Sequence, residues 1–397
     1  MKTLDNLDLA GKRVFIRVDF NVPLDKQGNV KDDLRIRAVL PSIRKVLESG
    51  GKVVLASHLG RPKGKPVPEF SLKPVSDYLS KLLCLPVKLA PDCIGDEVRR
   101  MAAELGKGEI LLLENLRFHA EEEKDDEAFS RELASLADVY VNDAFAVSHR
   151  AHASVHGITR FVPVCAAGYQ MAKEIKYFNE AMETPAKPLA IIIGGAKVST
   201  KIGVLEHLVS KADYLLIGGA MANTFLKAQG KEVGKSLVED EHMETAARFL
   251  KKAAEQGVKV YLPVDAVVAT SLESCGDVRQ VSVDKVPPDV QILDVGSGTV
   301  EVFEKVLGNC PTIVWNGPLG AFEYPPFNKS TFALAEYLGK SKALTVIGGG
   351  DSAAAVKQAK VDDKVSYVST GGGAFLEMME GLKLPGIAAL EACESRS

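Results

Sequence analysis

The chain has 397 residues, a formal net charge of −3, 46% hydrophobic residues and 25% charged residues. Single cores rarely grow beyond ~250–300 residues, so this length predicts two or three domains. The slightly acidic balance argues against a nucleic-acid-binding surface. No apolar run approaches the ~20 residues of a membrane-spanning helix, and residues 1–10 are too acidic and polar for a signal peptide, so we expect no membrane contact and a cytoplasmic location.

Apolar runs of strand length alternate with helix-like stretches through the first half of the chain. This alternation predicts parallel βαβ units with right-handed crossovers. The predicted strands are 13–18, 52–56, 110–113 and 139–141. The predicted helices are 32–49, 71–84, 93–105 and 125–137.

Polar and basic side chains follow these predicted strands. Because the carboxyl ends of parallel strands meet at one edge of a sheet, we expect the side chains to converge there. Guanidinium groups pair bidentately with carboxylate or phosphate, so such a rim suits a small, multiply charged anion. Any one arginine taken alone is more simply a solvated surface charge, and a single histidine a cap or core residue. The candidates are Asp19, Asn21, Arg35, His58, Arg61, Arg117, His149, Arg150 and His152.

The segment after the first domain has the pattern of a connecting helix. Residues 169–182 show helical apolar periodicity, and the next six residues are polar and punctuated by proline. This pattern predicts a helix that joins two domains. The expected boundaries are 1–168 for the N-terminal domain, 169–187 for the helix and linker, and 188–383 for the C-terminal domain. From the residues alone, the tail 384–397 could pack on either domain.

Four apolar runs in the second half end in paired or triple glycines. They are LAIIIGGAKVSTK from Leu189, YLLIGGAM from Tyr214, LTVIGGGD from Leu344 and SYVSTGGGA from Ser366. A buried strand that turns through glycine into a helix presents backbone N–H groups to an anion. One copy is most simply a tight turn, but four copies predict a phosphate-binding rim. The runs 259–263, 291–295 and 312–315 are expected to complete a second doubly wound parallel sheet.

Two apparent nucleotide motifs fail on spacing. The segment GKEVGKS, which begins at Gly230, ends like a P-loop, but Gln229 stands where that motif needs glycine. The pair Gly296 and Gly298 opens like a dinucleotide fingerprint, yet Glu301 occupies the place of the third glycine. A nicotinamide-dependent dehydrogenase is therefore disfavoured.

The six cysteines lack a CxxC pair and Cys/His metal spacing. We interpret them as buried or reduced thiols and expect no disulfide framework. They are Cys84, Cys93, Cys165, Cys275, Cys310 and Cys393.

Nine ordered motifs give the chain a close resemblance to the phosphoglycerate kinase family along essentially its full length. They are RVDFNVP from Arg17, SHLGRP from Ser57, ENLRF from Glu114, DAFAVSHRAHAS from Asp143, GGAKVSTK from Gly194, GGAMANTF from Gly218, WNGPLGAFE from Trp315, GGGDS from Gly348 and STGGGA from Ser369. The resemblance implies two doubly wound parallel-sheet (Rossmann-like) domains joined by a helix and hinge, with the tail returning to the N-terminal domain. It also implies a monomer that transfers phosphoryl between 1,3-bisphosphoglycerate and MgADP in glycolysis.

The resemblance assigns functional residues position by position. For 3-phosphoglycerate, it implies Asp19, Asn21, Arg35, His58, Arg61, Arg117 and Arg150. For ATP or ADP, it implies Gly195, Lys197, Lys201, Gly219, Asn316, Pro318, Glu323, Gly349, Gly350, Asp351 and Ser352, with Mg²⁺ at Asp351. The residues implied as catalytic are Arg35, Lys197, Gly350 and Gly373. A non-catalytic nucleotide-binding relative would not need Arg35, Lys197 and Asp351, and all three are present.

The chain also departs from the family pattern near both expected sites. Ala146, Val147 and Ser148 stand where Gly-Thr-Ala is usual, which puts the fine contacts beside Arg150 in doubt. Phe375 replaces a small residue just after the triple glycine, and we expect its ring to pack beneath that turn. Leu319 and Ala321 are milder changes near Glu323.

Overall fold

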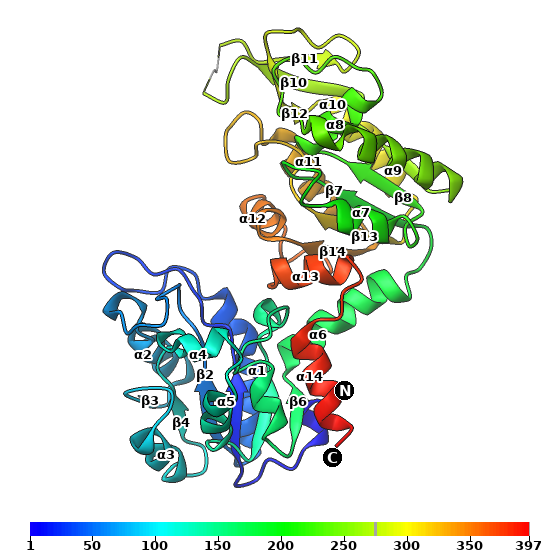
Figure 1. The fold of residues 1–397 in the computed structure, drawn as a ribbon. Coiled ribbons are helices and arrows are strands. Elements are labelled where there is room, and N and C mark those ends of the chain that lie inside the picture. Colours follow the sequence, from blue (N-terminus) through cyan, green and yellow to red (C-terminus); the bar gives the residue numbers. More distant parts are fainter. Residues whose placement is uncertain (274–275, 397) are drawn as a thin grey trace. The chain divides into compact units, whose positions relative to one another are not determined.

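The structure is a computed structural model that describes residues 1–273 and 276–396. The chain divides into two compact units (Figure 1). Unit 1 comprises Met1–Ile175 and returns at Lys383 for the rest of the described chain, and unit 2 comprises Lys176–Leu382.

Unit 1 is built on a six-stranded parallel sheet with strand order β3-β4-β2-β1-β5-β6. Four successive residues of β1 are buried, as expected for a parallel strand covered on both faces. Arg17 at the end of β1 is in register with Ala56 of β2 and Asn142 of β5, so the loops after these strands start from one sheet edge. The strands are β1 (Arg13–Arg17), β2 (Lys52–Ala56), β3 (Val87–Leu89), β4 (Ile110–Leu112), β5 (Val139–Asn142) and β6 (Cys165–Ala167).

The helices of unit 1 pack their apolar sides on this sheet. Ile36, Val39 and Ile43 of the first helix share a core with Val14 and Leu55 of the strands. Fully burying one such side chain stabilises the fold by about 1.5–3 kcal/mol. The helices are α1 (Leu34–Glu48), α2 (Lys73–Leu83), α3 (Asp96–Ala103), α4 (Ala120–Glu123), α5 (Glu127–Ala134) and α14 (Pro385–Glu394). None of the helices in the described part of the chain is long and apolar enough to cross a membrane.

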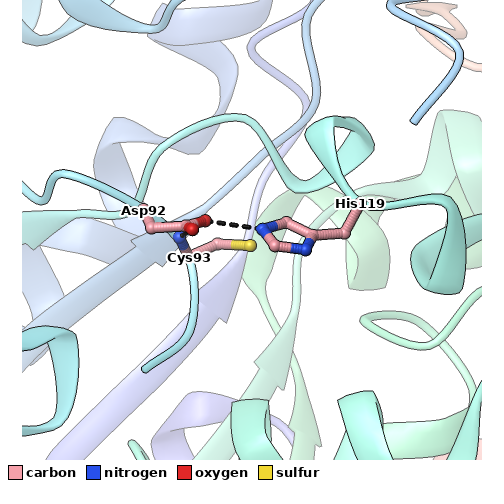
Figure 2. A group of neighbouring side chains, drawn as sticks. All are labelled: Asp92, Cys93 and His119. Atoms are coloured by element: carbon pink, nitrogen blue, oxygen red, sulfur yellow. Dashed lines mark hydrogen bonds and ion pairs between the residues drawn. The ribbon is translucent and has the colours of Figure 1, made fainter. Parts of the chain in front are cut away.

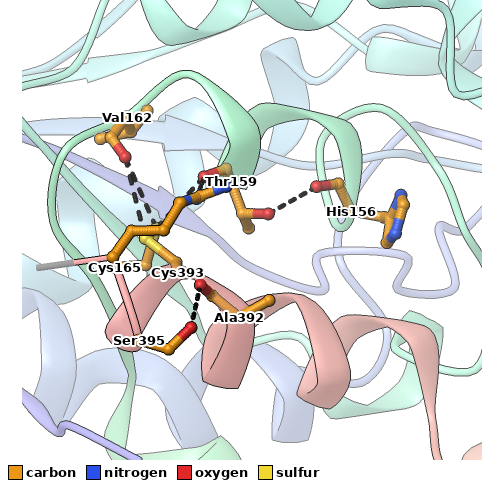
Figure 3. The surroundings of a disulfide bond; sticks show 8 residues. His156, Thr159, Val162, Cys165, Ala392, Cys393 and Ser395 are labelled. Atoms are coloured by element: carbon orange, nitrogen blue, oxygen red, sulfur yellow. Dashed lines mark hydrogen bonds between the residues drawn. A yellow bond between two sulfur atoms is a disulfide. The ribbon is translucent and has the colours of Figure 1, made fainter.

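The C-terminal helix α14 is joined covalently to unit 1. A disulfide connects Cys165 of β6 to Cys393 of α14, and their Cα atoms lie 6.0 Å apart (Figure 3). The amino group of Met1 forms an ion pair with Glu394 at 3.1 Å, so the N-terminus also contacts α14. The prediction that all cysteines are free thiols was therefore wrong for this pair.

Sequence spacing concealed the disulfide because 228 residues separate the two cysteines, which become neighbours only when α14 packs beside β6. Cys93 and Cys310 are buried free thiols and Cys84 is an exposed one, as expected. Cys275 lies outside the described residues.

The passage from unit 1 to unit 2 falls inside one helix, α6 (Tyr169–Phe178), between Ile175 and Lys176. A π-helical segment, η6 (Asn179–Glu183), follows directly. Tyr177 stacks on Tyr367 with ring centroids 4.5 Å apart, and Phe178 meets the edge of Phe375 at 5.6 Å. The second half of the helix is therefore held by aromatic packing within unit 2.

Unit 2 contains a second six-stranded parallel sheet, with strand order β15-β14-β13-β7-β8-β9. All five residues of β7 are buried, which agrees with the unbroken apolar run in the sequence. Trp315, the chain's single tryptophan, is fully buried in β13. The strands are β7 (Leu189–Ile193), β8 (Tyr214–Ile217), β9 (Lys259–Tyr261), β13 (Thr312–Asn316), β14 (Leu344–Gly348) and β15 (Tyr367–Val368).

Seven helices of unit 2 alternate with its strands in the described residues. They are α7 (Ile202–Leu208), α8 (Met221–Ala228), α9 (Met243–Glu255), α10 (Ser297–Leu307), α11 (Lys329–Leu338), α12 (Gly350–Gln358) and α13 (Gly372–Met379). The core contains Ile192, Trp315, Ile347, Leu334 and Phe303, which come from three strands and two helices.

A small antiparallel sheet in unit 2 was not foreseen. It has the order β11-β10-β12 and consists of β10 (Asp265–Ala269), β11 (Arg279–Ser282) and β12 (Gln291–Val295). The prediction that residues 291–295 belong to the parallel sheet was wrong, because β12 pairs antiparallel with β10. Short apolar runs carry no signal of strand direction, which is fixed by the partner strand.

Candidate functional site

The side chains that follow β1, β2 and β5 of unit 1 form a connected polar cluster. Arg35 Nη1 donates to Asp19 Oδ2 at 2.9 Å and to the carbonyl oxygen of Asn21 at 3.0 Å. The side-chain oxygen of Asn21 accepts from the backbone N–H of Gly60 at 2.9 Å. These bonds link the loop after β1 to the loop after β2 and to the first turn of α1.

His58 lies deeper in this cluster and is only 3% exposed. Burial, followed by the charges of Arg17, Arg117 and Arg35, lowers the pKa of His58 well below its usual value. Arg17 Nη2 lies 3.2 Å from His58 Nδ1. Because a guanidinium can only donate, Nδ1 accepts, and the proton of the neutral ring is on Nε2. Neutral His58 thus retains one N–H donor for another acceptor.

Arg117 is 6% exposed and is held by the loop after β2. Its Nη1 donates to the carbonyl oxygen of Gly60 at 3.0 Å, and its Nε lies 3.2 Å from Glu123 Oε1 without a hydrogen bond. Burial lowers the pKa of Arg117, and the charge of Glu123 opposes this. The charges of Arg17 and Arg150 lower the pKa further. The mutual repulsion of these cations is a cost that an anionic ligand would relieve.

His149, Arg150 and His152 join the cluster from the segment after β5. Burial, then the charges of Arg117 and Arg17, lower the pKa of His152 to about 3. Nε of the exposed Arg150 lies 3.3 Å from Nε2 of His149. Among the described residues, the Nδ1 atoms of both histidines are buried without a hydrogen bond, and that of His152 lies 4.0 Å from Oε1 of Glu122.

Arg61 stands apart from these contacts. Its side chain is exposed and makes no hydrogen bond or ion pair within the residues that the structure describes. It follows Gly60, whose backbone contacts both Asn21 and Arg117, so the loop itself is anchored in the cluster.

A buried ionic network beneath the cluster was missed by the sequence prediction. Arg17 is fully buried, and its Nε donates to Ser154 Oγ at 2.8 Å. Glu122, also fully buried, accepts from the backbone N–H of Ser154 at 2.9 Å and from its hydroxyl at 2.6 Å. Burial raises the pKa of Glu122, and the charge of Arg17 opposes this effect. Arg17 interrupts the apolar run RVFIRV, and a charge within such a run was the sequence signal that could have indicated a buried ion network.

The four glycine turns of unit 2 follow strands of one parallel sheet, as the sequence predicted. Gly219 has a φ of +69°, and a side chain there would collide with the backbone of Gly195. Gly349 has a φ of +94° and precedes the first turn of α12. These positions need glycine. Gly219 lets the loops after β7 and β8 approach closely, and Gly349 lies against Asn316 at the end of β13.

Lys201, Asn316 and Asp351 form the charged part of the unit 2 site. Lys201 Nζ donates to the side-chain oxygen of Asn316 at the end of β13. Burial lowers the pKa of Lys201, and the negative charges of Asp351 and Glu380 oppose that effect. Asp351 is exposed in the first turn of α12.

A cavity of about 410 Å³ opens beside these groups within unit 2. Its polar rim contains Gly195, Gly219, Pro318, Glu323 and Asp351, all of which the sequence had singled out. Its apolar lining, which was not predicted, contains Leu226, Leu237, Ile292 and Leu293. The volume lies in the range of small-molecule sites, and apolar walls with a polar rim suit a ring attached to phosphates.

Three further predicted residues are placed differently from this rim. Lys197 is exposed on the loop between β7 and α7. Ser352 is buried, and its hydroxyl accepts from the backbone N–H of Gly317 at 2.6 Å. Gly373 lies in the first turn of α13 and does not line the cavity.

Two departures from the family pattern are accommodated by local packing. Phe375 is 1% exposed, and its ring covers Gly348 at the end of β14, as expected. Ser148 is buried, its hydroxyl donates to the carbonyl of Ala144 at 3.0 Å, and its own carbonyl accepts from Gly386 of α14 at 2.9 Å. Val147 is buried and packs with Ala144 and Val155. Nothing in the described residues explains the presence of Ala146.

Two doubly wound α/β units, one with a buried arginine–histidine cluster and one with glycine turns around a cavity, define a phosphoryl-transfer enzyme of the two-domain kinase class. The model of the phosphoglycerate kinase family matches residues 4–382. The chain belongs to the phosphoglycerate kinase family, whose members transfer phosphoryl between 1,3-bisphosphoglycerate and ADP in glycolysis.

Individual relatives agree with this assignment. The chain is 76% identical to a phosphoglycerate kinase of Syntrophobacter fumaroxidans over 397 residues, which is all of both chains. It is similar to the structure of phosphoglycerate kinase from Coxiella burnetii, with a TM-score of 0.91, 43% identity and 98% of each chain covered. The enzyme structure from Pyrococcus horikoshii matches with a TM-score of 0.86, 32% identity and all of both chains covered.

Proposed function

We propose that unit 1 binds 3-phosphoglycerate and the corresponding acyl phosphate through Asp19, Asn21, Arg35, His58, Arg61, Arg117 and Arg150. The observation that carries the proposal is the burial of the charged Arg117 near Arg17 and Arg150, beside a neutral His58; burial and these cations lower the pKa of Arg117 and His58. Such an arrangement is unfavourable without an anion and favourable with one. The guanidinium groups would hold the phosphate and carboxylate of the substrate, and the Nε2–H of His58 would donate a hydrogen bond to one of its oxygens.

We infer that unit 2 binds ATP or ADP in the cavity rimmed by the glycine turns. The apolar lining would take the base, Glu323 the ribose hydroxyls, and the glycine N–H groups with Lys201 the phosphates. The remaining predicted residues of this site are Gly195, Lys197, Gly219, Asn316, Pro318, Gly349, Gly350, Asp351 and Ser352, although Ser352 acts by anchoring the backbone of Gly317.

Mg²⁺ fits the donor set on the cavity rim. Asp351 offers an exposed carboxylate there, and Mg²⁺ is commonly held by one or two carboxylates together with substrate phosphates. When bound, the ion would neutralise phosphate charge, and Asp351 would hold it against the nucleotide.

In the proposed mechanism, the residues of the chain position two bound substrates and stabilise charge. Phosphoryl transfer needs in-line placement and positive charge around the equatorial oxygens, with little covalent work by the protein. Arg35 of unit 1 and Lys197 of unit 2 would supply that charge, and the N–H groups of Gly350 and Gly373 would add donors. Because the substrates bind to different units, turnover would require hinge closure that excludes water from the acyl phosphate.

The proposed division of labour is tested by isothermal titration of the intact chain with 3-phosphoglycerate and, separately, with ADP. Arg117→Ala should weaken binding of 3-phosphoglycerate alone, and Lys201→Ala should weaken binding of ADP alone. Loss of both ligands in either variant would contradict separate sites. We further propose that the chain works as a monomer in the cytoplasm, as befits a glycolytic enzyme acting on small metabolites, and sedimentation analysis would test the monomer.

A further inference from the structure

A second group of side chains in unit 1, apart from the arginine cluster, has the composition of a metal site. Asp92 and Cys93 lie in the loop between β3 and α3, and His119 lies between the short helix η3 (Leu116–Phe118) and α4. Figure 2 shows the three side chains converging. One potential donor atom from each lies within 4.8 Å of the other two.

The chemistry of these donors is that of zinc-type ions. A thiolate, an imidazole and a carboxylate are the three kinds of side chain that bind Zn²⁺, and softer ligands such as thiolate select against Mg²⁺ and Ca²⁺. A second cluster of the described residues, Glu239, Glu241 and His242, has no sulfur and lies on the surface, so it lacks this selectivity.

The surroundings give an ion access and room for a fourth ligand. Cys93 is fully buried, whereas Asp92 and His119 are partly exposed and line a cavity of about 420 Å³ together with Glu114. An ion that enters from the cavity would meet the carboxylate and imidazole first, with the sulfur behind them. Zinc sites with three protein ligands keep a water molecule in the fourth position, and the cavity can hold one.

Without an ion, the same groups hydrogen-bond to one another through Asp92. His119 Nε2 lies 2.7 Å from Asp92 Oδ1, and the N–H of Cys93 donates to the same oxygen at 2.6 Å. The hydrogen bond to Asp92 raises the pKa of His119, while burial and then the charges of Asp92 and Glu122 raise that of the Cys93 thiol. Binding of a divalent ion would release the thiol proton to solvent, replace the Asp92–His119 hydrogen bond, and compensate the carboxylate charge beside the sulfur.

We propose that Asp92, Cys93 and His119 form a binding site for a divalent ion of the zinc class, separate from the Mg²⁺–nucleotide site. The ion joins the loop after β3 to His119, which directly follows η3. The helix η3 contains Arg117. The ion therefore stabilises unit 1 and restrains the backbone that carries one residue of the arginine cluster.

The test uses Co²⁺ as a spectroscopic substitute for Zn²⁺ on the full-length protein. Titration should produce one equivalent of a tetrahedral Co²⁺ spectrum with a near-ultraviolet thiolate-to-cobalt band, and Zn²⁺ should displace it. Cys93→Ser should remove the band, and His119→Gln should weaken Co²⁺ binding at least tenfold. Cys310→Ser and His242→Gln are the matched controls and should leave the spectrum unchanged.

Folding of each variant is checked by circular dichroism and by kinase turnover. His119→Gln retains a polar side chain that can hydrogen-bond to Asp92, so it separates loss of a metal ligand from loss of the fold. The proposal is overturned if the wild-type protein shows no thiolate band, or if the band persists in Cys93→Ser. In that case the three residues are only a hydrogen-bonded group centred on Asp92.

Discussion

Arg17 donates to His58 Nδ1 at 3.2 Å, and both side chains are almost fully buried at the ends of neighbouring parallel strands. This contact fixes the imidazole tautomer and directs the remaining N–H of His58 to another acceptor. Arg17 is held in turn by Ser154, which also bonds Glu122. The sequence identified His58 as a site residue, but it did not identify the buried residues Arg17 and Glu122 that hold it in position.

Substitution of Arg117 should separate the two substrates in binding experiments. Arg117→Ala removes a buried guanidinium, and a hydrogen bond to a charged group is worth about 1.5–3 kcal/mol. We therefore expect affinity for 3-phosphoglycerate to fall roughly 10- to 150-fold, with affinity for ADP unchanged, in calorimetric titrations. Arg131→Ala, an exposed arginine on α5, is the control. An Arg117→Ala variant with normal 3-phosphoglycerate affinity would remove this residue from the site.

Asp351 should govern the metal dependence of turnover. Asp351→Asn keeps the shape of the side chain but removes the charge expected to hold Mg²⁺. We expect the Mg²⁺ concentration needed for half-maximal turnover to rise at least tenfold, since loss of one charged hydrogen-bonding or ligand group costs about 1.5 kcal/mol or more. Asp362→Asn, beyond the end of α12, should change nothing. Equal Mg²⁺ requirements for Asp351→Asn and wild type would contradict the assignment.

The buried histidines should make unit 1 sensitive to acid. Burial and neighbouring arginines lower the pKa of His152 to about 3, whereas an unfolded histidine titrates near 6.5. Between these values the unfolded chain binds a proton that the folded chain does not, so the free energy of unfolding decreases as the pH falls from about 6.5 towards 3. The slope is up to about 1.4 kcal/mol per pH unit for each such group.

The measurement is urea unfolding at a series of pH values, with hydrogen exchange used to monitor unit 1. His152→Gln cannot take up the proton. The slope of its unfolding free energy against pH should therefore be smaller than that of wild type by the equivalent of about one proton. His242→Gln in unit 2 should behave like wild type. Identical slopes for His152→Gln and wild type would show that this histidine is not held neutral.

The disulfide should contribute to the stability of unit 1. It closes a loop of 228 residues between β6 and α14, and removing a disulfide typically costs about 2–4 kcal/mol. We expect Cys393→Ala, or reduction of the wild-type protein, to lower the free energy of unfolding of unit 1 by this amount. Cys84→Ala, at an exposed free thiol, is the control. Thiol labelling that finds Cys165 and Cys393 free in the native protein would contradict the bond.

The sequence predicted features that depend on local pattern. The alternation of apolar runs and helices indicated both parallel sheets, and the glycines after residues 193 and 217 indicated turns that the structure contains. The direction of β12 could not be predicted, because antiparallel pairing with β10 depends on a partner strand distant in the sequence. The Cys165–Cys393 bond was missed for the same reason.

The same difference between local pattern and long-range contact separates the site residues that were predicted from those that were missed. His58 and Arg117 lie in the loops after β2 and β4, where the strand pattern placed them, whereas Lys201 was assigned through the resemblance to the family and stays a prediction. Arg17 and Glu122 act from beneath the site, and their roles follow only from burial and from a shared contact to Ser154. The apolar lining around Ile292 could not be predicted, because the residue types that line the cavity are the same as those of an ordinary hydrophobic core.

The central claim is that Arg35 and Lys197 stabilise the same transferring phosphoryl group from different units. A double-mutant cycle on kcat tests it most directly, with Arg35→Ala, Lys197→Ala, the double variant and Lys340→Ala as an exposed control. Lys197→Ala should lower kcat a hundredfold or more (~3 kcal/mol for a lost charge-stabilising donor) with little change in nucleotide affinity. The two losses should combine non-additively, because both groups act on one transition state. A near-normal kcat for Lys197→Ala, or strictly additive losses, would contradict the account.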